Sequence, residues 1–213
     1  MGGRGASSTS GGATGGLDMG HIISTRSLVS ERGASQKEVD DVLGVMSDVE
    51  EKYGVRINDA VVSKLDLKGS TTMGYYDAGG NFGINEKFFD SARVDRAYDR
   101  NIESGFHPKR GNKSGTEALA AHEMGHAVTD EAARRAGLGD WQLDAVSNKI
   151  VGRAKSKLGA KSTSDVRKGI SGYAQESNSE AVAEAFADVY CNGSNASAES
   201  KAVVAELDAY FRR

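Results

Sequence analysis

The stretch SGTEALAAHEMGHAVTDEAARRAG, residues 114–137, determines how the rest of the sequence is interpreted. Ser114, followed three residues later by Glu117, forms the capping-box pattern that starts a helix. Alanines fill the interior of the stretch, and Gly137 is the residue type that most often ends a helix. The sequence therefore predicts one long helix that stops at Gly137.

This predicted helix carries the residues HEMGH at 122–126. His122 and His126 are four residues apart, so they lie on one helical face and can offer two ring nitrogens to one metal ion. Glu123 lies beside that face, where a carboxylate can take a proton from metal-activated water. Two ordinary surface or core histidines could occur at this spacing by chance, but the chain has only 4 histidines. We therefore predict a metal site, with Glu123 as the general base.

A second alanine-rich helix is predicted at 178–191, NSEAVAEAFADVYC, with Asn178 or Ser179 as its cap. Glu180, Glu184 and Asp188 recur at intervals of four on one face. Spaced carboxylates usually mark a solvated face. Here the residues between them are largely apolar, so we expect at least one buried acid with a positive partner.

A catalytic zinc ion needs three protein ligands, and the acidic helix can supply the third in two ways. In the first, Glu180 binds the metal and Glu184 lies behind it. In the second, Glu184 binds and Asp188 lies behind, as in thermolysin-like enzymes. Tyr173, just before this helix, could donate its phenol to the oxyanion of a peptide-hydrolysis reaction.

Gly125 would let another helix approach the metal side closely, although an ordinary packing glycine would look the same.

Two blocks, HEMGH at 122–126 and YAQESNSEAVAEAF at 173–186, resemble the zinc peptidase domain of anthrax lethal factor and the bacterial Pro-Pro endopeptidases. The resemblance implies a gluzincin-type zincin fold and favours the first arrangement. It implies Glu180 as the third zinc ligand, Glu184 as the residue that orients a zinc-bound histidine, and Tyr173 as the oxyanion donor. The opening MGGRGASS is similar to the start of proteins encoded among prophage head genes, which suggests a phage context.

The composition excludes several classes of partner. The chain has 213 residues and a net charge of −3, which gives no electrostatic basis for binding nucleic acid or an anionic membrane. It contains no apolar run long enough to span a bilayer. The single Cys191 allows no internal disulfide, and no basic and apolar leader opens the sequence. We expect no signal peptide, and a cytoplasmic or phage-associated protein.

The chain divides into a flexible Gly/Ser-rich tail at 1–30 and one domain at 31–213. Short β-branched and aromatic runs at 55–89 predict a small, mostly antiparallel sheet, with a hairpin turn at AGGN, 78–81. We expect an exposed edge strand of this hairpin to bind a peptide substrate in extended form, beside Phe82 or Tyr75.

Helical periodicity or stop signals predict four further helices around this sheet, at 35–54 with a cap at Ser35, 91–104, 141–157 and 198–211. Trp141 is expected to anchor the core or the cleft, and His107 to be an ordinary loop residue. The expected architecture is an α+β zincin-like fold, in which a small sheet lies above the active-site helix and the lower half is mostly helical.

The function expected from these features is zinc-dependent metalloendopeptidase activity on a peptide or protein substrate. One alternative is a catalytically silent, zinc-stabilised phage structural or interaction module. Glu123 argues against it, because a purely structural site needs no base beside the metal. Another is a peptidase toxin or effector that is delivered to another cell. Manganese, cobalt and iron also accept His and Glu ligands, so the sequence leaves the native metal open, and it does not determine the oligomeric state.

Overall fold

The computed structural model of the chain describes residues 2–4, 29–30, 36–55, 57, 59–63, 73–76, 81–85, 91–139 and 143–212. Three sequence predictions fall outside these ranges: the cap at Ser35, most of the turn at 78–81 and the packing of Trp141.

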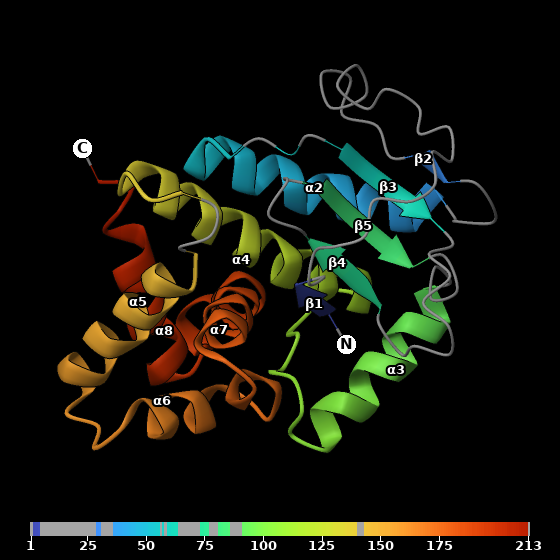
Figure 1. Cartoon of the computed structure of the whole chain (residues 1–213). Helices are drawn as coiled ribbons and strands as arrows, with labels where there is room; N and C mark the ends of the chain where they lie inside the picture. The colour runs from blue at the N-terminus through green and yellow to red at the C-terminus, as the bar shows by residue number, and fades with distance from the viewer. Residues whose placement is uncertain are drawn as a thin grey trace.

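Helices form most of the described structure (Figure 1). They are α2 (Gln36–Tyr53), α3 (Ser91–Glu103), α4 (Gly115–Arg135), α5 (Leu143–Leu158), α6 (Thr163–Ile170), α7 (Asn178–Asn192) and α8 (Ala198–Asp208), with the 3-10 helices η3 (Tyr173–Gln175) and η4 (Gly193–Asn195). Each helix predicted from the sequence is present, with ends that differ by a few residues. The α6 helix was not predicted, although Ser162 and Asp165 form a capping box at its start.

Helix α4 lies at the centre of the molecule, and its start and end carry the signals that the sequence predicts. The Ser114 hydroxyl accepts from the Glu117 amide, the Glu117 carboxylate accepts from the Ser114 amide, and Gly137 adopts the left-handed φ of +73° just after the helix. From Gly115 to Asp130 every residue except Glu117 is buried. The helix is enclosed because α2, α3, α5, α7 and β4 all pack against it.

The sheet has five described strands in the order β1-β4-β5-β3-β2. They are β1 (Gly2–Arg4), β2 (Val29–Ser30), β3 (Asp59–Ser63), β4 (Gly74–Tyr76) and β5 (Asn81–Asn85). Only β4 and β5 pair antiparallel, with Tyr75 opposite Gly83. The other three pairs are parallel, so the prediction of a mostly antiparallel sheet is wrong. Helix α2 connects β2 to β3, and a crossover of this length joins strands that run in the same direction.

Of the tail predicted at 1–30, residues 1 and 5–28 lie outside the described residues, while Gly2–Arg4 and Val29–Ser30 are strands. Gly3 pairs with Tyr75 on the outer edge of β4, so that edge is not exposed as the sequence analysis expected. Strand pairing uses backbone N–H and C=O groups, so a segment without core-forming side chains can still complete a sheet edge.

The helices and the mixed sheet together confirm the α+β class. In Figure 1, α2, β3 and β5 lie above α4, β4 and β1 lie at its right-hand end, and α5 to α8 lie below it. Within the described part of the chain, every helix is too short or too polar to cross a membrane.

Helices α4 and α7 approach closely at Gly125, as predicted. A β-carbon added at this position would lie 2.8 Å from Cα of Ala183 and 3.0 Å from Cβ of Phe186. Because real β-carbons essentially never approach other atoms to 2.8 Å, one of the two backbones would have to move. The missing side chain therefore sets the distance between the two helices.

The variant Gly125→Ala should lower the free energy of unfolding by about 1–3 kcal/mol, because the methyl group overpacks this contact. Urea denaturation of the metal-free protein measures the change. Gly152→Ala in α5 is the matched control: no atom lies within 4 Å of its added methyl group, so it should be neutral or stabilise the fold by up to about 1 kcal/mol. Equal effects of the two substitutions would contradict the close helix contact.

Candidate metal centre

Two histidines of α4 and one glutamate of α7 bring three ligand-type atoms together. The Oε2 atom of Glu180 lies 3.2 Å from Nε2 of His122 and 3.4 Å from Nε2 of His126. His122 and His126 are almost fully buried, and Glu180 is 8% exposed. Helix α7 begins immediately before this glutamate, because the Ser177 hydroxyl caps the helix by accepting from the Glu180 amide. The cap is therefore Ser177 rather than the expected Asn178 or Ser179.

The polar atoms of this centre suit a cation. Among the described residues, Nε2 of His122 and Oε2 of Glu180 are buried without a hydrogen bond of acceptable geometry. Buried polar atoms of this kind are costly unless a partner satisfies them. Two imidazole nitrogens and one carboxylate oxygen form the three-ligand set of a catalytic zinc ion. The observed residues thus fit Zn²⁺.

His122, Glu123 and His126 alone also form a group that could hold a metal, because one ligand atom from each lies within 4.8 Å of the others. Glu180 is the better third ligand, since its oxygen lies within 3.4 Å of both histidine nitrogens. Glu123 is completely buried, and neither of its carboxylate oxygens has a hydrogen bond from the described residues. It is thus available for proton transfer rather than committed to a partner.

Glu184 lies behind His122. Its Oε1 is 2.8 Å from Nδ1 of His122, and its Oε2 accepts a hydrogen bond of 2.7 Å from the Ser171 hydroxyl. A carboxylate only accepts, so Nδ1 of His122 must carry a proton, and once the ring is neutral, as metal ligation requires, Nε2 keeps its lone pair for the metal. This geometry corresponds to the first arrangement considered from the sequence, with Glu180 at the metal and Glu184 behind.

Asp188 takes no part in the centre. Its carboxylate accepts from the Asn192 side chain at 2.8 Å and from the Ser197 amide at 3.0 Å, and so connects the end of α7 to the start of α8. The second arrangement would require Asp188 to lie behind a metal-bound Glu184. Its contacts do not fit that role.

The three glutamates titrate differently because their neighbours differ. Burial opposes ionisation of all three, but His126 and His122 lower the pKa of Glu180 well below its usual range. Contacts with His107 and His122 likewise lower the pKa of Glu184 to about 2. Burial raises the pKa of Glu123 to about 8; the charges of Glu180 and Glu184 add to this rise, and the charge of His122 opposes it. One acid is therefore poised to exchange a proton near neutral pH.

Tyr173 lies at the edge of the centre, on η3. Its ring centroid is 5.7 Å from that of His122. Burial and the neighbouring carboxylates raise its pKa well above the usual range, so the phenol stays protonated and can donate. The Tyr173 amide donates to the Phe106 carbonyl at 2.9 Å, which attaches η3 to the loop before α4.

His107 is the functional residue that the sequence analysis missed. It does lie in a loop, but its ring is buried and its Nδ1 is 3.0 and 3.1 Å from the two oxygens of Glu184. One signal could have drawn attention to it: His107 precedes Pro108, the only proline, which restricts the backbone of the preceding residue.

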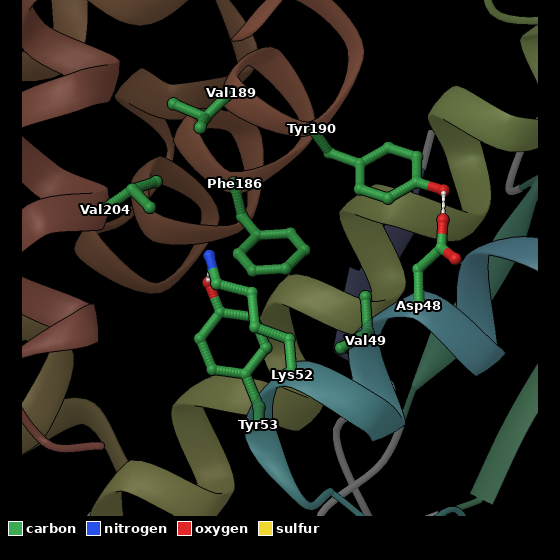
Figure 2. A pocket seen from close by; sticks show the side chains of 8 residues that line it. All are labelled: Asp48, Val49, Lys52, Tyr53, Phe186, Val189, Tyr190 and Val204. Atoms are coloured by element: carbon green, nitrogen blue, oxygen red, sulfur yellow. Dashed lines mark hydrogen bonds between the residues drawn. The ribbon is translucent and has the colours of Figure 1, made fainter. Parts of the chain in front are cut away.

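One pocket, with a volume of about 170 Å³, lies away from this centre, between α2 and α7. Figure 2 shows Phe186 and Tyr53 on its wall and the Tyr190 hydroxyl bonded to Asp48. None of its lining residues is a candidate ligand, base or oxyanion donor.

Comparison of this chain with models of known protein families, with curated proteins and with solved structures finds no match. The assignment of a function therefore depends on the geometry of the centre.

Zinc binding to the metal-free protein should release protons. Burial alone would lower the pKa of His122, but the contacts with the carboxylates of Glu180 and Glu184 outweigh it and raise the pKa to about 10. Below that pH the ring is charged, and ligation requires the neutral ring. We expect at least one proton released near pH 7 and an apparent affinity that rises about tenfold per pH unit from pH 6 to 8.

Calorimetry in buffers of different ionisation enthalpy measures the released protons. Glu184→Gln removes one of the carboxylates that raise the pKa of His122, so this variant should release fewer protons. A binding heat that is the same in every buffer, together with a flat pH profile, would show that zinc does not displace a proton from His122.

Proposed function

We propose that this chain is a zinc-dependent metallopeptidase with a zincin-like fold of the gluzincin type. The proposal rests on the convergence of His122, His126 and Glu180, from two helices, next to a buried Glu123 that has no hydrogen bond from the described residues. When bound, zinc supplies a Lewis acid that polarises a carbonyl oxygen and acidifies water. The same arrangement is what the sequence resemblance to lethal factor and the Pro-Pro endopeptidases implies.

Glu123 would take a proton from the attacking water and return it to the leaving amine. Its raised pKa suits both steps, since a general base works best when its pKa is close to the working pH. Gly74 of β4 leaves the necessary room: a β-carbon there would lie only 3.1 Å from Oε1 of Glu123. The absence of a side chain at position 74 thus lets the sheet edge run directly beside the base.

Tyr173 would donate its phenol hydrogen to the oxyanion that forms at the scissile carbonyl. The hydrogen bonds of η3 to the loop before α4 hold this tyrosine beside His122, so the donor is positioned before substrate arrives. Phe106, whose ring centroid is 5.2 Å from that of Tyr173, completes this side of the site.

The substrate would be an extended peptide beside β4, held by main-chain hydrogen bonds. Strand β1 now pairs with the outer edge of β4, so a substrate strand can use this edge only after Gly2–Arg4 has left it. Of the two aromatic residues expected at the cleft, Phe82 is fully buried in the core and Tyr75 is only partly buried. Tyr75 is therefore the better candidate for substrate contact.

A catalytically silent zinc module is the second candidate, and one observation favours it. His122, Glu123 and His126 are at most 2% exposed, as expected for a metal that only stabilises the fold. A peptidase would have to open this site, with β1 as the nearest removable cover. A toxin or effector would use the same chemistry and would differ only in how it is delivered to another cell.

The variant Glu123→Gln separates the two candidates. If the chain is a peptidase, the zinc-loaded parent should cleave members of a diverse peptide library, and the variant should cleave them about 100-fold to 10,000-fold more slowly, because proton transfer is lost. Zinc content, measured by atomic absorption, should remain at the parent value. Glu131→Gln is a control on the same helix, since Glu131 pairs with Arg134 and Arg135 at the surface.

Cleavage by the Glu123→Gln variant at the parent's rate would rule out the proposed mechanism. A parent protein that binds zinc and cleaves no peptide, with or without residues 2–4, would leave the silent module as the better description.

A further inference from the structure

His107 contacts Glu184, the carboxylate that lies behind His122. Its Nδ1 lies between the two oxygens of Glu184, at 3.0 and 3.1 Å, and its ring stacks on Tyr98 with an interplanar angle of 10°. Both rings are buried. Among the interactions of the described residues, this is one of two histidine contacts to Glu184, and the other is the contact with His122.

The backbone around His107 is fixed on both sides. The Phe106 amide donates to the Asn101 carbonyl at 2.7 Å, which attaches the loop to the end of α3. The Gly172 amide donates to the Gly105 carbonyl at 2.8 Å, which attaches it to the segment before η3. Pro108 further restricts His107 to extended conformations. The loop therefore presents the imidazole to Glu184 in one orientation.

Glu184 is completely buried and has three donors: His107, His122 and Ser171. Three donors hold a carboxylate ionised and leave it little rotational freedom. Removing one of them would let the carboxylate turn away from His122 or take up a proton. Either change would weaken the hydrogen bond that orients the His122 ring toward the metal.

We propose that His107 is a positioning residue of the metal centre: it donates to Glu184 and so holds this carboxylate against Nδ1 of His122. This inference rests on the metal site of the proposed function, but not on peptide cleavage. It assigns His107 a role through Glu184, without contact to metal or substrate.

The alternative is that His107 only fills space beside Tyr98. Three substitutions separate hydrogen bonding from packing. His107→Phe keeps a ring to stack on Tyr98 but has no donor. His107→Asn places an amide nitrogen close to the position of Nδ1, whereas His107→Gln places it farther out, close to Nε2.

The test is the zinc affinity of each variant, measured in the full chain by competition with a chromophoric chelator, together with the melting temperature of the metal-free protein. His107→Phe should lower zinc affinity about 10–100-fold, the usual effect of losing a residue that supports a metal ligand. His107→Asn should bind zinc within about threefold of the parent, because it restores the donor.

Parent-like zinc affinity in a folded His107→Phe variant would overturn the inference, as would equal losses in the Phe and Asn variants. If the Phe variant does not fold, the zinc affinities of the two amide variants test the inference. His107→Asn should bind zinc at least about tenfold more tightly than His107→Gln, and equal affinities would overturn the inference. If the variants show this ranking of zinc affinities and the parent cleaves no peptide, the role of His107 is supported and the peptidase proposal is wrong.

Discussion

The close contact between α4 and α7 at Gly125 brings the proposed metal ligands of the two helices together. His122 and His126 come from one helix and Glu180 from the other, so their ligand atoms can meet within 3.4 Å only if the two backbones nearly touch. A glycine facing Ala183 provides this distance. The alanines of both helices serve the same purpose, since larger side chains would separate the two sets of ligands.

The second organising feature is that burial and hydrogen-bond partners give the three glutamates of the centre different protonation states. Glu180 and Glu184 each face histidines and are held as carboxylates, one toward the proposed metal and one behind it. Glu123 is buried as deeply but has no hydrogen bond from the described residues, so it keeps a proton to a higher pH than the other two and can exchange it near neutral pH. Environments that push apart the pKa values of neighbouring acids are a common way to assign acid and base roles in enzymes.

Much of the centre could be predicted from the sequence because it depends on local rules. The capping box at Ser114 and the four-residue spacing of His122 and His126 fix a helix and one of its faces. The deep burial of Glu180 and Glu184 follows from the apolar residues between them.

What the sequence analysis missed depends on contacts between distant segments. His107 meets Glu184 only because the loop after α3 is attached to η3, and no pattern of spacing encodes that attachment. Strand β1 is similar, since backbone pairing with β4 needs no particular side chains. The parallel pairing of β2 with β3 follows from α2 acting as a crossover, which could not be recognised without the two-residue strand β2.

The most direct test of the account is X-ray absorption spectroscopy of the zinc-loaded protein, because it reports the atoms around the metal whatever the protein does. The account predicts two imidazole nitrogens and carboxylate or water oxygens at about 2.0–2.2 Å and no sulfur. It further predicts that Glu180→Ala changes the oxygen shell or abolishes binding, while Asp188→Ala leaves the spectrum unchanged. A sulfur ligand at about 2.3 Å, or a spectrum that responds to Asp188 and not to Glu180, would contradict the proposed centre.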